Sequence, residues 1–474
     1  MSKDAAAKVR FIGFRSLNQL GTTREASDAS STYIALIFAV SATVGLLLAI
    51  DPPWAAVLAA GSPLIAAANY AKRYRDLLDY RIIYLLALLF WSYQPTFGLI
   101  GLLIADRSAV DSFNPVIFVH YSLGLTLSPL LVLFFRRPSV CYPQIKINVS
   151  RIFPVSLSLW SGYALCALTL LTFVAVEGKS GFLDVALSNF PRSILLLIQA
   201  VISLRYARTK QYGRLLVLTI ATIGIFSFHV TNRTSMGIPA IIGALAALKS
   251  SALVTRPLMS KHTIGIVAVL FTLLVTADLQ KQTGTSIVVS AATVASNPSS
   301  FVAVFEDSNY AARSDSTELF FQFLNLTIGQ DHYRPGSWAM QLLTIFTPRS
   351  IYPDKPEYDI SKLYYSEGLI DRPLYYDFLF DRLIDSGAIG VLLYHAFYLF
   401  IMRSILSLRG LLASNGLEHL GLGIYFISLI TFFLVMRGPI ILFAWFVAAP
   451  VLIGIAALLA RAFFRGSVIH GVRR

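Results

Sequence analysis

Apolar runs of about 20 residues recur along almost the whole chain, and each is long enough to cross roughly 30 Å of hydrocarbon as a helix. Only 14% of the 474 residues are charged, whereas 56% are hydrophobic. We therefore predict an all-α polytopic membrane protein with about twelve transmembrane helices. The predicted spans are 32–50, 53–71, 82–104, 114–135, 153–175, 188–207, 214–232, 236–254, 263–280, 387–407, 417–436 and 438–460.

The distribution of basic residues predicts the orientation of these spans, because Lys and Arg are retained in short cytoplasmic loops. If the N-terminus is cytoplasmic, the cytoplasmic segments hold 26 of the 39 Lys and Arg residues but only 6 of the 25 Asp and Glu residues. Both termini are then cytoplasmic. This retention also accounts for the formal charge of +14, so we expect no nucleic-acid partner but do expect contacts with membrane lipids.

The predicted organisation has one long connection, which lies on the periplasmic side and is where we expect the function, because loops of such length usually carry function or structure of their own. Within it, 316–328 and 336–346 have helical apolar spacing but are too short to span, so we predict short amphipathic helices there. The predicted segments are a cytoplasmic N-terminal segment (1–31), transmembrane helices 1–9 (32–280), the periplasmic functional loop (281–386), transmembrane helices 10–12 (387–460) and a cytoplasmic tail (461–474).

The long loop contains the segment FTPRSIYPDKP, in which prolines alternate with Arg349 and Lys355. Each proline removes an N–H and disfavours the α conformation of the preceding residue, so the backbone should be extended and stiff. A stiff cationic loop suits a phosphate ligand, since guanidinium can bind two phosphate oxygens at once. The alternative is a solvated turn whose cations touch lipid headgroups.

Further arginines lie on the predicted outer face, where retention in the cytoplasm does not explain them. Arg233 is the only charge in the turn FHVTNRTSMG, and Arg437 is the only charge in FLVMRGPI. The long loop adds Arg313 and Arg334. Snorkelling at helix ends is one interpretation, but ionisable residues at the mouths of membrane helices are functional candidates. With Arg349 and Lys355, these arginines predict a binding site for an anionic ligand.

The run YRPGSWAMQLLTIFTPRSIYPDKPEY, followed by YYDFLFDRLIDSGAIGVLLYHAFYLF, resembles the Wzy-type O-antigen polymerases. The resemblance covers roughly residues 331–400. It rests on the proline-flanked Arg and Lys, on Asp381 as the acidic residue, and on Gly387 and Gly390 at the start of the next span. The chain departs from the family pattern where Asp381 replaces the common Glu and where Asp385-Ser386-Gly387 replaces Asn-Phe-Gly.

The resemblance implies an inverting membrane glycosyltransferase of the GT-C kind in lipopolysaccharide biosynthesis, located in the bacterial inner membrane. Its donor and acceptor would be undecaprenyl-diphosphate-linked oligosaccharides, and a chain-length regulator protein would be a partner. The arginines and Lys355 would bind the diphosphate. An acceptor hydroxyl also needs a base, for which the long loop offers His332 and Asp331, with Asp381, Glu306 and Asp307 as alternatives.

We expect neither a metal nor another cofactor, because the loop has no Asp-x-Asp stretch and the chain has no nucleotide-type phosphate loop or zinc-ligand spacing. Two other functions stay open. An O-antigen ligase would share the outer arginines but would use lipid A core as the acceptor. A lipid-linked oligosaccharide flippase would also have about twelve spans, but alternating access is usually built from repeated halves, and the sequence shows no second long loop.

Overall fold

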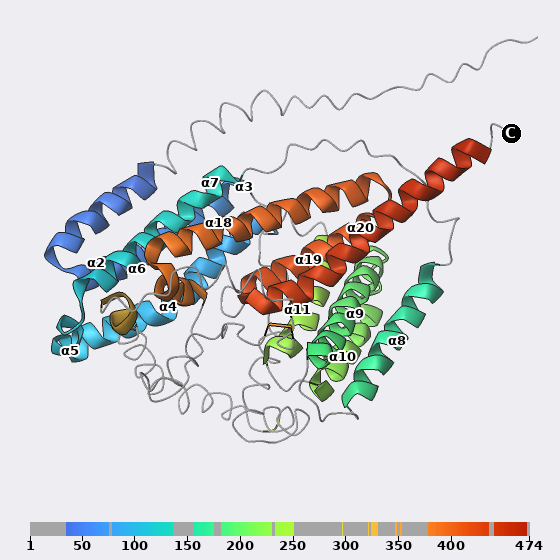
Figure 1. The fold of residues 1–474 in the computed structure, drawn as a ribbon, viewed down its shortest axis with the longest axis horizontal. Coiled ribbons are helices and arrows are strands. Elements are labelled where there is room, and N and C mark those ends of the chain that lie inside the picture. The colour runs from blue at the N-terminus through green and yellow to red at the C-terminus, as the bar shows by residue number, and fades with distance from the viewer. Residues whose placement is uncertain are drawn as a thin grey trace, which may run out of the picture.

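The described part of the chain consists of helices and the turns that connect them, with no strand among these residues (Figure 1). The structure is a computed structural model. It describes residues 35–74, 78–135, 155–174, 182–229, 233–250, 296, 321, 324–329, 347, 351–352, 378–435 and 440–471.

Each predicted span except 263–280, which lies outside the described residues, coincides with helical structure. Residues 35–50 form the first described helix. The others are α2 (Pro52–Ala59), α3 (Gly61–Tyr74), α4 (Tyr80–Ala105), α5 (Arg107–Asp111), α6 (Pro115–Leu127), η1 (Ser128–Leu130), α7 (Leu131–Phe134), α8 (Val155–Val174), α9 (Phe182–Arg208), α10 (Tyr212–His229), α11 (Arg233–Ser250), η4 (Asn325–Gly329), α18 (Phe378–Ser414), α19 (Glu418–Val435) and α20 (Ile440–Gly471).

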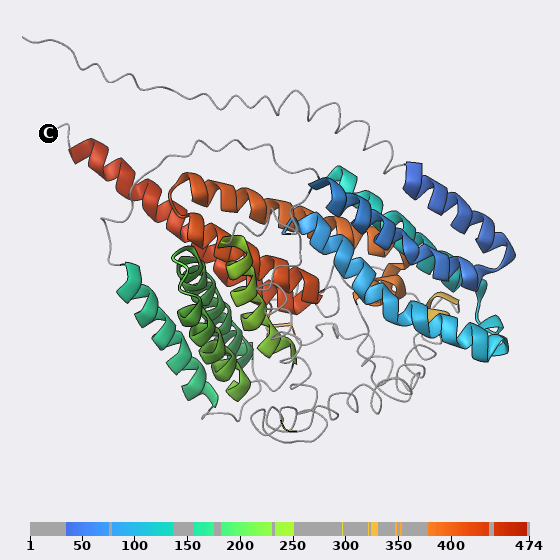
Figure 2. The same ribbon diagram turned by 180° about the vertical axis from the view of Figure 1, so that it is seen from behind.

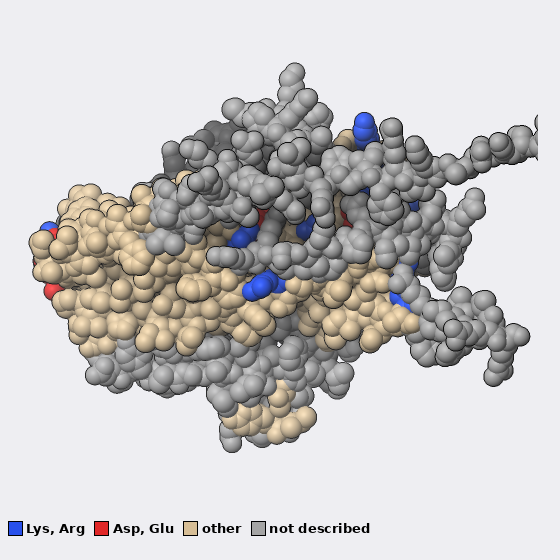
Figure 3. All heavy atoms as spheres, turned by 90° about the horizontal axis from the view of Figure 1, so that it is seen from above, with Lys and Arg blue, Asp and Glu red and all other residues tan. Residues whose placement is uncertain are grey.

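Three described segments are long and apolar enough to cross a membrane, namely Pro115–Phe134, Phe190–Arg208 and Gly387–Ser414. Large apolar side chains are exposed on the helix surfaces, including Phe38, Ile104, Phe134 and Leu165. The space-filling view shows long stretches of described surface without charged side chains (Figure 3). Such a surface suits contact with lipid rather than water, as expected for a helical membrane protein.

The helices pack in two groups that α18 and α19 connect (Figures 1 and 2). In the first group α6 packs against α2 and α18, and α4 packs against α3. In the second, α9 is central and contacts α8, α10, α11, α19 and α20. Because α18 and α19 pack against each other, while α18 also contacts α4 and α6 and α19 also contacts α9, one continuous core runs through both groups.

Several helix ends follow directly from local sequence. The Asn114 side chain caps α6 by accepting from the Val116 N–H at 3.0 Å, and Pro115 occupies the first turn, where its missing N–H has no helical partner. Residues with positive φ make the tight turns after α9 and α18, with φ of 57° at Lys210 and 75° at Gly416.

Contacts between chain segments distinguish the two ends of the helices. At one end, the Tyr80 hydroxyl donates to the Phe135 carbonyl, and the Tyr425 hydroxyl donates to the Leu78 carbonyl. At the opposite end of α6, Asn114 contacts η4, which belongs to the predicted periplasmic loop. We call the Asn114 end of the apolar segment Pro115–Phe134 the outer end, and the end next to Phe135 the inner end. The side of the membrane that each end faces stays a prediction.

Two helices extend beyond the predicted spans. Helix α18 begins at Phe378, before the predicted span 387–407, and α20 continues to Gly471, beyond the predicted span 438–460. The loop boundary at 386 stays a prediction. Between Phe378 and Gly387 the apolar residues recur three and four positions apart and no proline intervenes, which favours a helix. Hydropathy missed both extensions because it detects the apolar part of a helix, not its polar ends.

Candidate functional site

Helix η4, which belongs to the predicted long loop, docks on the outer end of α6 through reciprocal asparagine contacts. The Asn325 Oδ1 accepts from the backbone N–H of Asn114 at 2.9 Å, and the Asn114 Nδ2 donates to the Gly329 carbonyl at 3.1 Å. A Cβ atom at Gly329 would lie 2.6 Å from Asn325 Oδ1, so the glycine allows this close approach. The contacts hold both ends of η4 against the start of α6.

Buried apolar side chains also pack at this contact between η4 and α6. Phe321, just before η4, is fully buried, and its ring centroid lies 5.6 Å from that of Phe118 and 6.0 Å from that of Tyr121. Leu324 and Ile328 are also buried. These three residues belong to the segment 316–328 predicted as a helix, and within it Asn325–Gly329 form a π-helix rather than an α-helix. Short π-helices are frequently found at functional sites.

The start of α18 packs on the same outer part of α6. The Leu383 and Val391 side chains both lie against Gly124. The backbone N–H of Ala388 donates to Nδ1 of His120 at 3.1 Å. Helix α18 also contacts η4. We call this meeting point of α6, η4 and the start of α18 the outer junction, defined by Asn114, His120, Phe321, Asn325, Gly329, Leu383 and Ala388.

The short connection between α4 and α6 is held by hydrogen bonds and an ion pair of its charged residues. The Asp106 carboxylate caps α5 by accepting from the Ala109 N–H at 3.2 Å. Hydrogen bonds from the Ser108 side chain and from that N–H hold the pKa of Asp106 below its ordinary value. Arg107 pairs with Asp51 at 2.7 Å, which joins this connection to the turn before α2. The chain therefore enters α6 from a constrained loop.

The predicted site residues have different relations to the outer junction. Asp381 lies in the first turns of α18, two residues before the buried Leu383, and Arg233 is the first residue of α11. The side chains of these two residues lie outside the described set. The remaining predicted residues also lie outside it: Asp331, His332, Arg313, Arg334, Arg349, Lys355, Arg437, Glu306 and Asp307. Their roles stay predictions.

The structure identifies residues that sequence reasoning missed. Asn114 precedes Pro115, and this Asn-Pro pair is a recognisable helix-start signal. His120 has no comparable signal, because nothing in the local sequence indicates a contact with Ala388. Within the described residues no group of three or more His, Cys, Asp and Glu side chains could hold a metal ion. The expected metal independence remains a prediction, because the side chains of the candidate acids of the long loop lie outside the described set.

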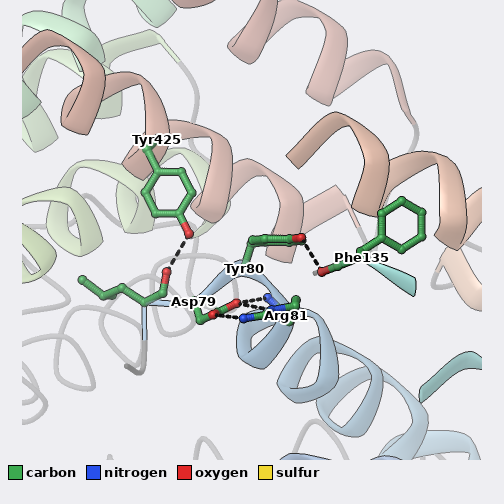
Figure 4. Close-up of polar contacts among 6 residues, drawn as sticks. Asp79, Tyr80, Arg81, Phe135 and Tyr425 are labelled. Carbon is green, nitrogen blue, oxygen red and sulfur yellow. Dashed lines mark hydrogen bonds and ion pairs between the residues drawn. The ribbon is translucent and has the colours of Figure 1, made fainter. Parts of the chain in front are cut away.

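A buried ion pair at the inner end was also missed (Figure 4). Arg81 donates from Nε to Asp79 Oδ1 at 2.9 Å and from Nη2 to Oδ2 at 2.7 Å, and Asp79 Oδ1 also caps α4 by accepting from the Arg81 N–H. The two side chains are 4% and 0% exposed. The Arg81 guanidinium lies 5.0 Å from the Tyr70 ring centroid. This forked, enclosed pair has the features of a structural clamp between α3 and α4.

The asparagine contacts make a testable contribution to stability. Replacing Asn325 with alanine should lower the free energy of unfolding by about 1–3 kcal/mol, because the Asn114 N–H then loses its acceptor in a partly buried position. Denaturant titration in mixed detergent micelles measures this loss. Asn325→Asp is the matched control, since it keeps an oxygen acceptor close to the start of α6, where negative charge is favourable. Equal losses in both variants would show that the hydrogen bond is not what holds η4.

The described residues define an all-helical membrane protein in which η4 docks on the start of α6. Comparison of the chain with models of protein families, with curated proteins and with solved structures gives no match.

Proposed function

We propose that the protein is an O-antigen polymerase that joins undecaprenyl-diphosphate-linked oligosaccharide repeat units on the periplasmic face. The observation that supports this proposal is the outer junction, where η4 and the start of α18 meet on α6. Asp331 and His332 follow Gly329 by two and three residues, and Asp381 precedes Leu383 by two. The two chain segments that lead to the candidate catalytic residues are thus held against one helix.

The proposed reaction is inverting and uses no metal. The acceptor hydroxyl oxygen attacks the anomeric carbon of the donor sugar, and the bond from that carbon to the lipid diphosphate breaks. The bonding electrons leave with the diphosphate, and the hydroxyl proton passes to a base, for which His332 is the first candidate and Asp331 and Asp381 are the next. Arg233, Arg349, Lys355 and Arg437, with Arg313 and Arg334, would stabilise the negative charge that develops on the leaving group.

A glycosyltransferase needs its base and its cations in fixed relative positions, since catalysis of this kind depends on prearranged charges and reacting groups. The outer junction favours such an arrangement because it ties the long loop to α6 by two hydrogen bonds and a buried aromatic residue. An O-antigen ligase would need the same arrangement, so it is the second candidate function. The two differ in the acceptor, which an experiment in cells distinguishes.

Deleting the gene in its own host should change the surface polysaccharide in a way that identifies the reaction. A polymerase deletion should leave lipid A core that carries one repeat unit, whereas a ligase deletion should leave bare core and accumulated lipid-linked polymer. Gel electrophoresis of the surface polysaccharide separates these outcomes. An unchanged ladder of polymer lengths would contradict both proposals.

Complementation of the deletion then tests the role of the cations. Arg349→Ala should fail to restore long polymer although the protein is inserted, because a forked guanidinium is lost. Arg349→Lys is the matched control and should restore only part of the polymer length, since an ammonium keeps the charge but not the two parallel hydrogen bonds. Full restoration of long polymer by Arg349→Ala would support the alternative interpretation, in which the proline-rich segment is a solvated turn. Immunoblotting of the membrane fraction verifies that each variant is present.

A further inference from the structure

Helix α18 contains a break at Gly387, where φ is 61°. A right-handed helix needs φ near −63°, and a left-handed value is unfavourable for residues other than glycine. The residue therefore divides α18 into an outer piece, Phe378 to Ser386, and the apolar segment Gly387–Ser414 that is long enough to cross a membrane. Asp381 lies on the outer piece.

His120 of α6 stabilises the backbone on the membrane side of this break. The N–H of Ala388, the residue after Gly387, donates to Nδ1 of His120 at 3.1 Å. A backbone N–H can only donate, so Nδ1 must present a lone pair and the ring proton of the neutral imidazole lies on Nε2. The contact joins residues 268 positions apart in the chain. The imidazole thus serves as an acceptor for an amide at a point where the regular helix is interrupted.

Because α18 packs on α6 on both sides of the break, the hydrogen bond to His120 Nδ1 constrains the position of the break relative to α6. Leu383, before the break, and Val391, after it, both lie over Gly124, which is one turn along α6 from His120. Helix α6 therefore contacts the outer piece, the break and the membrane piece of α18. A change at His120 would alter the angle between the two pieces while the apolar contacts still hold each of them near α6.

The histidine of α18 itself, His395, has a different environment. His395 is fully buried, and its Nδ1 lies 2.9 Å from the Tyr84 hydroxyl, which also donates to the Ser128 carbonyl. Its partner is a side chain, and the backbone around it is regular helix. A core histidine of this kind holds helices together, whereas His120 contacts the backbone of the break itself.

The geometry assigns His120 as a positioning residue that fixes the break at Gly387 and thereby the direction of the outer piece that carries Asp381. This assignment rests on the proposed function for its effect on catalysis, but its effect on the backbone is independent of it. His120 is not itself placed among the reacting groups. It acts through Ala388 and Gly387 on the placement of the outer piece next to η4.

The test compares three replacements of His120 that differ in where they place an acceptor. Asn puts Oδ1 on Cγ, as His puts Nδ1 on Cγ, so His120→Asn keeps an acceptor at the same point. His120→Gln moves the acceptor one bond further out, and His120→Leu removes it. If His120→Leu does not fold, the comparison of Asn with Gln still decides the question.

Two measurements are made on each full-length variant. Hydrogen exchange of the peptide that contains Ala388 should become faster in His120→Leu and His120→Gln and should stay close to the wild type in His120→Asn. Turnover of undecaprenyl-diphosphate-linked oligosaccharide by purified protein in liposomes should fall roughly a hundredfold in His120→Leu, the effect expected for a misplacement of about 1 Å. The fall should appear in kcat with little change in KM, because the proposed diphosphate-binding cations are not altered, and His120→Asn should restore most of it.

The outcomes separate this inference from the proposed function. Unchanged exchange at Ala388 in His120→Leu would overturn the assignment, and so would faster exchange with wild-type turnover. Equal loss of kcat in His120→Asn and His120→Leu would also overturn it, since the position of the acceptor would then be irrelevant. If the wild-type protein shows no turnover at all, the proposed function fails, and the exchange data alone decide whether His120 fixes the break.

Discussion

Replacing Asp79 with alanine should destabilise the folded protein by about 3–5 kcal/mol, the usual consequence of removing one partner from a buried ion pair. Arg81 is 4% exposed in its side chain and would keep its charge without the carboxylate that now accepts two of its hydrogen bonds. The variant also loses the cap on the Arg81 N–H at the start of α4. Denaturant titration in mixed detergent micelles gives the free energy of unfolding directly.

The protein provides a matched control for this prediction at its outer end. Arg107 and Asp51 form an ion pair of the same length, 2.7 Å, but the Arg107 side chain is 52% exposed. Water and salt screen exposed pairs, so Asp51→Ala should cause only a small fraction of the loss seen in Asp79→Ala. Equal losses in the two variants would show that burial does not determine the contribution of Asp79.

A second variant isolates the charge from the packing. Combining Asp79→Leu with Arg81→Met replaces the buried pair by apolar side chains, and such replacements are often close to neutral because no unpaired charge remains buried. The double variant should therefore be more stable than Asp79→Ala, although it still lacks the helix cap. A double variant as unstable as the single one would assign the loss to the cap and to packing.

The second large effect concerns catalysis. His332→Ala should lower turnover by roughly a hundredfold to ten-thousandfold, the usual contribution of a positioned general base. Donor binding should largely persist, because the proposed cations still bind the diphosphate. His332→Gln should not restore turnover, since an amide can accept a hydrogen bond from the hydroxyl but has no useful basicity near neutral pH. The measurement is the rate of glycan extension by purified protein with lipid-linked substrate.

His419 offers a matched control for the loss of a histidine. It lies at the inner end, where its Nε2 is 3.2 Å from the Arg208 guanidinium, and His419→Ala should leave the turnover rate close to that of the wild type. A wild-type rate in His332→Ala would eliminate His332 as the base and make Asp331 and Asp381 the next residues to replace. Loss of donor binding together with rate would instead indicate that His332 positions the loop.

The sequence allowed the helices to be located but not all of their ends. Apolar runs predicted spans at 82–104 and 417–436, which correspond to α4 (Tyr80–Ala105) and α19 (Glu418–Val435). The start of α18 at Phe378 was not predicted, because a helix can continue beyond its apolar part wherever its backbone hydrogen bonds are satisfied locally. The prediction of a change near 387 nevertheless coincides with the break at Gly387.

The candidate site was predictable only in outline. The long loop and its cations stay predictions. The apolar spacing of Phe321, Leu324 and Ile328 indicated a helical face, and the structure shows these three side chains to be buried. The roles of His332, Asp331 and Arg349 stay predictions. No local pattern of residues indicated that this face would pack on α6.

Hydropathy and periodicity located most of the described apolar helices, because both patterns depend on residues close together in the chain. The tertiary structure alone decided that Asn114 meets Asn325, that His120 meets Ala388 and that Tyr425 meets Leu78. These partners are 211, 268 and 347 positions apart. Their contacts depend on how whole helices pack against one another. The residues next to each partner in the sequence therefore do not indicate which distant residue it will contact.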